Sequence, residues 1–169
     1  MAEEITNRVA NSKLVTIDLE AWYPEGDRKL LDIAPWLYEG LVLRESDFRD
    51  FVENHDWKQY TGGYLGLHCS AEAIIPSWAY LLITAKASNY AKKVVVGNLE
   101  LLETVIYQEI IENLELSAFI DRPIIVKGCA DKPIPPTAMV QLVAKIQPIA
   151  KSIMFGEACS TVPLFKKKK

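Results

Sequence analysis

The chain has 169 residues, half of them apolar, a quarter charged and 9% aromatic, a composition that excludes disordered and fibrous proteins. This length suits one domain with a sizeable core. The longest apolar run, residues 78–85, is far shorter than the ~20 residues that span a bilayer, so an integral membrane protein is also excluded.

The charge distribution argues against a nucleic-acid-binding surface. The net charge is -3, from 19 basic and 22 acidic residues, and residues 166–169 are a terminal run of four lysines. Phosphate contacts need clustered Lys and Arg, which the acidic body lacks. We interpret residues 1–165 as a single domain and the lysine run as a solvated tail; the alternative is a weak tether to RNA or an anionic surface. The acidic first residues lack an apolar export segment, which predicts a cytoplasmic protein.

The first third of the chain predicts a strand pair and a helix. Partial alternation and β-branched residues predict a strand at 14–19, and turn residues at 24–27 predict a return in a second strand at 28–33. The spacing of Phe48, Phe51 and Val52 predicts a helix over 46–54. We expect these elements at one edge of a larger sheet.

From residue 63 onward, short apolar runs alternate with amphipathic stretches of helical length. Strands are predicted at 64–69, 93–97, 123–127 and 152–155, and helices at 76–90, 99–114 and 136–147, with a helical turn at 116–120. This order predicts an α/β fold with a mostly parallel sheet and helices on both faces. We expect no internal repeat.

All three cysteines follow predicted strands: Cys69, Cys129 and Cys159. An odd number of cysteines without an export signal predicts free thiols. Ligands of open α/β sheets bind outside the carboxyl ends of the strands, where these thiols would meet. Three thiolates would hold zinc or iron there, with His68, Glu157, Asp131 or water as a further ligand.

Two other interpretations of the cysteines stay open. Cysteine is often buried as a small apolar side chain, so the thiols would then be inert packing. A cysteine nucleophile is disfavoured, because His68 and Cys69 are adjacent and point to opposite faces of a strand, and His55 lies in a predicted loop.

Other chemistry lacks support in the sequence. The common motifs of nucleotide hydrolysis, dinucleotide binding, zincin proteolysis and α/β-hydrolase chemistry are absent. Four aromatic residues would form either an exposed patch for a partner or ordinary core and homodimer packing. They are Trp22, Tyr23, Trp36 and Tyr38.

Five stretches of the sequence are similar to a family of uncharacterised bacterial proteins, mainly from Bacteroidota, catalogued as domain of unknown function 2480. The stretches read ITNRVA, DFR, CSAEAIIP, KGCADKP and GEACSTVP, and the resemblance spans essentially the whole chain. It implies no established activity. The resemblance also implies a gene neighbourhood, because genes of this family often lie beside iron–sulfur cluster assembly genes of the sulfur-mobilisation type. It therefore implies that assembly machinery as a protein partner.

Two functional hypotheses follow. The first is an accessory factor in iron–sulfur cluster or metal handling, with Cys69, Cys129 and Cys159 in one crevice and His68, Glu157 and Asp131 completing it. The alternative is a non-catalytic interaction or regulatory module with structural cysteines. Whether the protein is an enzyme stays open.

Overall fold

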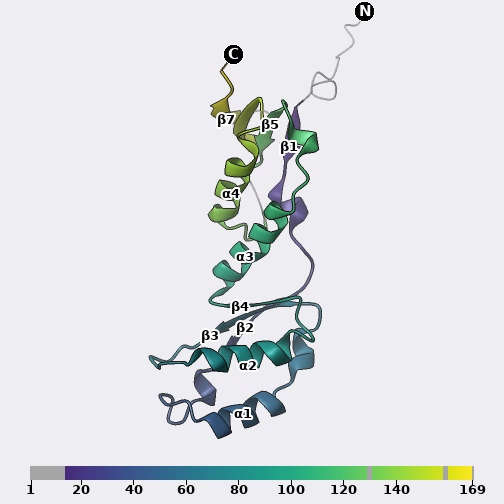
Figure 1. Cartoon of the computed structure of the whole chain (residues 1–169). Helices are drawn as coiled ribbons and strands as arrows, with labels where there is room; N and C mark the ends of the chain where they lie inside the picture. The colour runs from purple at the N-terminus through teal and green to yellow at the C-terminus, as the bar shows by residue number, and fades with distance from the viewer. Residues whose placement is uncertain (1–13, 129–130, 158–159, 169) are drawn as a thin grey trace, which may run out of the picture. The chain divides into compact units, whose positions relative to one another are not determined.

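The computed structural model describes residues 14–128, 131–157 and 160–168. Its strands are β1 (Val15–Ile17), β2 (Arg28–Asp32), β3 (Tyr64–His68), β4 (Lys93–Val96), β5 (Pro123–Val126), β6 (Ser152–Glu157) and β7 (Ser160–Lys166) (Figure 1). Its α-helices are α1 (Glu45–Asn54), α2 (Ser77–Ala87), α3 (Leu99–Glu112) and α4 (Pro136–Ile146). Short 3-10 helices are η1 (Leu19–Trp22), η2 (Ala34–Trp36), η3 (Trp57–Tyr60) and η4 (Ser117–Phe119). A helix with the length and apolar character to cross a membrane is not found among the described residues.

The strands form two sheets, and most of them run parallel, so the predicted α/β class is confirmed. One sheet has the order β2-β3-β4 and is wholly parallel, and the other has the order β1-β5-β6-β7, with only β7 antiparallel. The chain accordingly divides into two compact units. We call residues 24–106 the inserted unit, and residues up to 23 together with residues from 107 onward the flanking unit.

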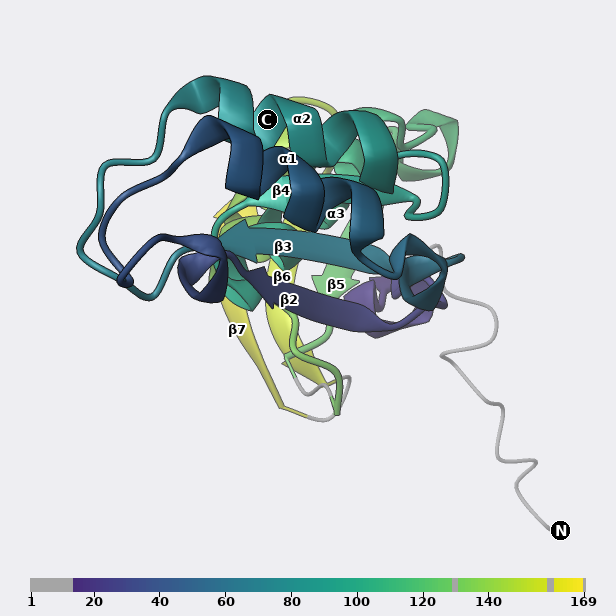
Figure 2. The same cartoon turned by 90° about the horizontal axis from the view of Figure 1, so that it is seen from below.

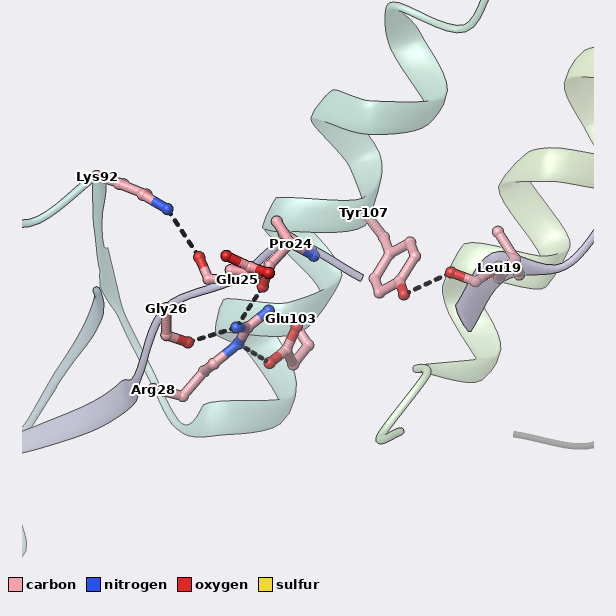
Figure 3. Close-up of polar contacts among 8 residues, drawn as sticks. All are labelled: Leu19, Pro24, Glu25, Gly26, Arg28, Lys92, Glu103 and Tyr107. Carbon is pink, nitrogen blue, oxygen red and sulfur yellow. Dashed lines mark hydrogen bonds and ion pairs between the residues drawn. The ribbon is translucent and has the colours of Figure 1, made fainter. Parts of the chain in front are cut away.

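The predicted pairing of the first two strands is wrong. β1 pairs with β5 and β2 pairs with β3, so they belong to different sheets. The turn between them does not reverse into a hairpin, because the Arg28 guanidinium holds it by donating to the carbonyls of Pro24 at 2.7 Å and Gly26 at 2.6 Å (Figure 3). The same side chain pairs with Glu103 of α3, with 2.6 Å between Nε and Oε1.

The core of the inserted unit lies between its sheet and two helices that cover the same face, α1 and α2 (Figure 2). Alternation in β3 points Leu65 and Leu67 into this core, and both are fully buried. α1 contributes Phe48 and Val52, four residues apart, and α2 contributes Ile83. Right-handed crossovers between sequential parallel strands place α1 and α2 on one face of this sheet. Arg28, which alternates in β2 with the core residue Leu31, pairs with Glu103 of α3.

An aromatic cluster closes one end of this core. Trp36 makes edge contacts with Phe48 and Trp57, and His55 lies beside both tryptophans. The His55 Nε2 atom is 2.9 Å from the Tyr60 hydroxyl. Burial lowers the pKa of His55 and raises the pKa of Tyr60, so both groups are held in their neutral forms.

The core of the flanking unit is built in the same way. Ile124 and Val126 of β5 alternate into it, and α4 contributes Leu142 from above the sheet. The second half of α3 contributes Tyr107, which is fully buried and whose hydroxyl donates to the Leu19 carbonyl at 2.8 Å (Figure 3). The hydrogen bond satisfies the only polar atom that this side chain brings into the core.

The two units are copies of one fold, so the expectation of no internal repeat is wrong. In the inserted unit the order is β2-η2-α1-η3-β3-α2-β4, and in the flanking unit it is β1-η1-α3-η4-β5-α4-β6. Residues 75–98 match residues 134–157 without a gap, and eight of the 24 positions are identical. The identical pairs are Ile75/Ile134, Pro76/Pro135, Ala79/Ala138, Ala85/Ala144, Lys86/Lys145, Ala91/Ala150, Lys92/Lys151 and Gly97/Gly156.

Backbone hydrogen bonds repeat with the same spacing of 59 residues. The amide of Gly62 donates to the Tyr90 carbonyl at 3.0 Å, and 59 residues later the amide of Asp121 donates to the Ile149 carbonyl at 2.9 Å. Gly62 and Asp121 both have a positive φ, of 72° and 52°. A non-glycine residue seldom takes this conformation, so its recurrence shows that the same turn is built twice.

The buried positions also coincide. Phe48 of α1 corresponds to Tyr107 of α3, and both are fully buried. The first strands match too. Asp32 at the end of β2 and Asp18 directly after β1 each accept a hydrogen bond from the amide two residues later, and each precedes a tryptophan by four residues. The flanking copy is therefore interrupted after η1 by the complete inserted copy.

Candidate functional site

The carboxyl edge of the sheet in the inserted unit carries two of the residues predicted as ligands, His68 and Cys69. Asp32 lies opposite His68 in the parallel register. Its carboxylate accepts hydrogen bonds from the Ser70 hydroxyl at 2.5 Å and from the Ser70 amide at 3.0 Å. The hydroxyl bond is the largest cause of a lowered pKa of Asp32, so this carboxylate is ionised and held in place.

Cys69 is part of the local packing. It is partly buried and packs against the core of the inserted unit, and its Sγ donates to the Ala71 carbonyl at 3.5 Å. Burial is the largest cause of a raised pKa of the Tyr80 hydroxyl, and the charge of Cys69 raises this pKa further. These contacts give the thiol the surroundings of a structural cysteine.

The equivalent edge of the flanking unit carries charged groups. The Lys127 ammonium donates to Asp18 Oδ2 at 2.8 Å, which lowers the pKa of Asp18 and raises the pKa of Lys127. The charges of Glu157 and Glu20 raise the pKa of Lys127 further. The backbone amide of Asp131 donates to Glu20 Oε2 at 3.2 Å. The Lys127–Asp18 ion pair and the acidic residues near it therefore occupy this edge.

The six predicted ligands are not brought together by one sheet. Of the strands that precede the three cysteines, β3 belongs to one sheet and β5 and β6 belong to the other. His68 is the last residue of β3 and Cys69 follows it, whereas Glu157 is the last residue of β6 in the other sheet and Asp131 lies beyond β5. Cys129 and Cys159 lie outside the described residues. Within the described ranges, no group of three or more His, Cys, Asp or Glu side chains has the arrangement of a metal site.

The predicted aromatic patch is also divided. Trp22 and Tyr23 pack against the core of the flanking unit, and Trp36 is buried in the core of the inserted unit. Only Tyr38 is well exposed. Core packing, the alternative offered by the sequence, explains the other three.

Four exposed large apolar side chains lie on two loops at the carboxyl edge of the inserted sheet. Residues 37–44 follow η2 and residues 69–76 follow β3, and both loops lie at the end of the sheet to which the β3 arrow points (Figure 2). We name their four large exposed side chains the loop surface. They are Tyr38, Leu41, Val42 and Ile74, which are 41%, 62%, 55% and 94% exposed.

The second copy of the fold shows that the fold itself does not require this apolar surface. The position of Ile74 is taken by Pro133 in the flanking unit, next to the charged residues Asp131 and Lys132. The same strand-loop-helix unit is thus built around a more polar loop. Sequence reasoning missed Ile74 because two isoleucines precede Pro76, and only the structure shows that Ile75 packs against the core while Ile74 is exposed.

Comparison with known proteins yields one family. No curated protein and no solved structure matches the chain. The model of a family described as "Protein of unknown function (DUF2480)" matches residues 3–167, which is nearly the full length.

Proposed function

Since the chain belongs to the DUF2480 family, whose description assigns no activity, we propose from its structure that it is a non-catalytic interaction module of the cytoplasm. The loop surface would bind another protein. The observation that carries this proposal is the exposure of Ile74, at 94%, on a loop at the same end of the sheet as the loop that carries three further exposed apolar side chains (Figure 2). Exposed apolar groups gathered at one place are typical of protein–protein contacts.

The state of the polar residues at the same edge supports a binding role over catalysis. The Asp32 carboxylate is engaged with Ser70 and with the amide of Ala34, and Cys69 donates to a carbonyl. A general base or nucleophile needs to meet a substrate, whereas these groups fix the bases of the two loops. Rigid loop bases lower the entropy lost when a partner binds.

A loop-surface variant tests this proposal. Ile74→Asp and Leu41→Asp each place a charge where the partner would bury an apolar side chain, and we expect each to weaken binding at least about tenfold. The full chain serves as bait, and the captured protein is identified, purified and titrated by calorimetry against wild type and both variants.

Val140→Asp is the matched control, because Val140 is 68% exposed on α4 of the flanking unit. It should leave binding unchanged. Equal binding by all variants, or failure of the wild type to retain any protein, would overturn the proposal. Mass measurements across a concentration series show whether the bound protein is a second copy of this chain.

A second candidate function is accessory handling of iron, zinc or iron–sulfur clusters, with the cluster assembly machinery as partner. It is favoured by the pairing of β5 with β6, in which Val126 lies opposite Phe155. These strands lead toward Cys129 and Cys159 and end at one edge, where Glu157 and Asp131 add carboxylates. Cys69 follows β3 of the other sheet.

Metal content separates this candidate from the first. If it holds, anaerobically purified protein contains iron or zinc, and Cys129→Ser and Cys159→Ser each lose it. Cys69→Ser is the matched control and should retain the metal. Metal, acid-labile sulfide and the ultraviolet–visible spectrum are measured for all four proteins. Metal-free wild type after reconstitution, or equal loss in the control, would contradict the candidate.

A further inference from the structure

A space of about 360 Å³, open to solvent, lies over the exposed face of α1, and we call it the groove. It is lined by Asp47, Asp50, Phe51 and Asn54. These positions follow the i, i+3, i+4, i+7 spacing that places side chains on one face of a helix. The groove therefore combines an aromatic ring with two carboxylates along a single stripe.

The aromatic ring in the groove is rigidly supported. Phe51 stacks on Trp36 with an interplanar angle of 3° and 6.0 Å between ring centroids. Trp36 is in turn fixed by edge contacts to Phe48 and Trp57 in the core. Phe51 is still 44% exposed, so part of its ring is available to a ligand. Trp36 belongs to η2, directly before the 37–44 loop, so the groove adjoins the loop surface.

The carboxylates of the groove are not neutralised by the arginines near it. Arg44 lies over the Tyr38 ring, and Arg49 pairs with Glu45 at 2.9 Å and lies over the Trp78 ring. Within the described part of the chain, neither Asp47 nor Asp50 forms an ion pair. The groove thus carries two negative charges without a cation.

We infer that this groove receives an arginine side chain of the partner protein, an inference that rests on the proposed interaction function. A planar guanidinium can stack on the exposed part of Phe51 and donate hydrogen bonds to the carboxylates of Asp47 and Asp50. The aliphatic stem of the arginine would cover the apolar part of the groove. Lysine fits less well, because its ammonium is a compact, strongly hydrated charge that cannot stack.

The partner would then present an arginine next to an apolar segment. The arginine occupies the groove on α1, and the apolar segment covers Leu41, Val42 and Ile74. The net negative charge of the protein favours the approach of such a basic segment, and the attraction weakens as salt is added.

Titration of n-butylguanidinium into the full chain tests the arginine site without the partner. We expect saturable amide shifts confined to α1 and η2 by nuclear magnetic resonance, with millimolar affinity typical of a single side chain. Asp47→Asn with Asp50→Asn should weaken this binding at least about tenfold. n-Butylammonium should bind several-fold more weakly. Ile74→Asp is the matched control and should leave n-butylguanidinium binding unchanged.

The outcomes separate this inference from the proposed function. Absence of saturable binding, shifts outside α1 and η2, or equal affinity in the double variant would overturn the arginine site. If that occurs while Ile74→Asp still abolishes partner binding, the interaction function stands and only the arginine site is wrong. If n-butylguanidinium binds as expected while Ile74→Asp leaves partner binding intact, the loop surface is wrong and the groove remains.

Discussion

Glu103→Gln is expected to destabilise the inserted unit by about 3–5 kcal/mol, because it leaves the buried Arg28 charge without its carboxylate. The side chains of Arg28 and Glu103 are only 10% and 5% exposed, so water cannot replace the lost partner. Arg28 also holds the turn at Pro24 and Gly26, so its displacement would loosen the entry of the chain into this unit.

Urea unfolding followed by tryptophan fluorescence measures this loss. Trp36, Trp57 and Trp78 lie in the inserted unit, so the signal reports mainly on it. Glu45→Gln is the control, since Glu45 pairs with Arg49 on the surface, and such exposed pairs contribute about 0.5 kcal/mol or less. A loss below about 1 kcal/mol for Glu103→Gln would mean that the pair is not buried in solution.

Phe48→Ala is expected to destabilise the inserted unit by about 3–5 kcal/mol, since it removes a fully buried ring and leaves a cavity. The ring contacts Trp36 and Trp78 edge-on, so their fluorescence should change as well. Phe51→Ala is a matched control on the same helix. Because Phe51 is 44% exposed, Phe51→Ala should lower the free energy of unfolding clearly less than Phe48→Ala does.

Calorimetry and urea unfolding both measure the Phe48→Ala effect. Equal losses for Phe48→Ala and Phe51→Ala would contradict the assignment of Phe48 to the core. The repeat predicts a parallel result in the flanking unit, where Tyr107 occupies the corresponding position. Tyr107→Ala should lower the free energy of unfolding at least as much as Phe48→Ala, because the Leu19 carbonyl also loses its hydrogen bond.

The sequence predicted the regular elements well where local pattern decides them. The β-branched runs at 94–96 and 124–126 mark β4 and β5, and the prolines at 76 and 136 lie at the starts of α2 and α4. β7 was not predicted, because Pro163 interrupts its run and strand proline is tolerated only at an edge such as this one.

Strand pairing could not be predicted, because it depends on contacts between distant segments. β1 selects β5 and not β2, although β2 is much closer in sequence. The repeat was not predicted for a related reason. A buried strand requires apolar residues but not particular ones, so the corresponding positions hold different residues: Leu65 and Leu67 in β3, but Ile124 and Val126 in β5. Comparing the chain with itself at a spacing of 59 residues would have found it.

The sequence predicted a candidate site at the strand ends, and at the end of the inserted sheet it did not single out Asp32 and Ser70. Strand ends do carry polar and thiol groups, yet Asp32 and Ser70 bind each other. The stripe of Asp47, Asp50 and Phe51 was readable from helical spacing within the predicted helix. It was missed because a surface aromatic is recognised only when the structure shows which face the core leaves exposed.

The interruption of one copy by the other sets the order in which the protein can fold during synthesis. All the strands of the inserted unit have been made by residue 96, whereas β1 waits for β5, and the Lys127–Asp18 contact joins residues 109 positions apart. Closing that long loop costs entropy and slows the final step. Until β5 emerges from the ribosome, β1 has no partner while the inserted sheet already presents β2 and β4 as its edges, so we expect mispairing of β1 with one of these edges to compete with the native pairing.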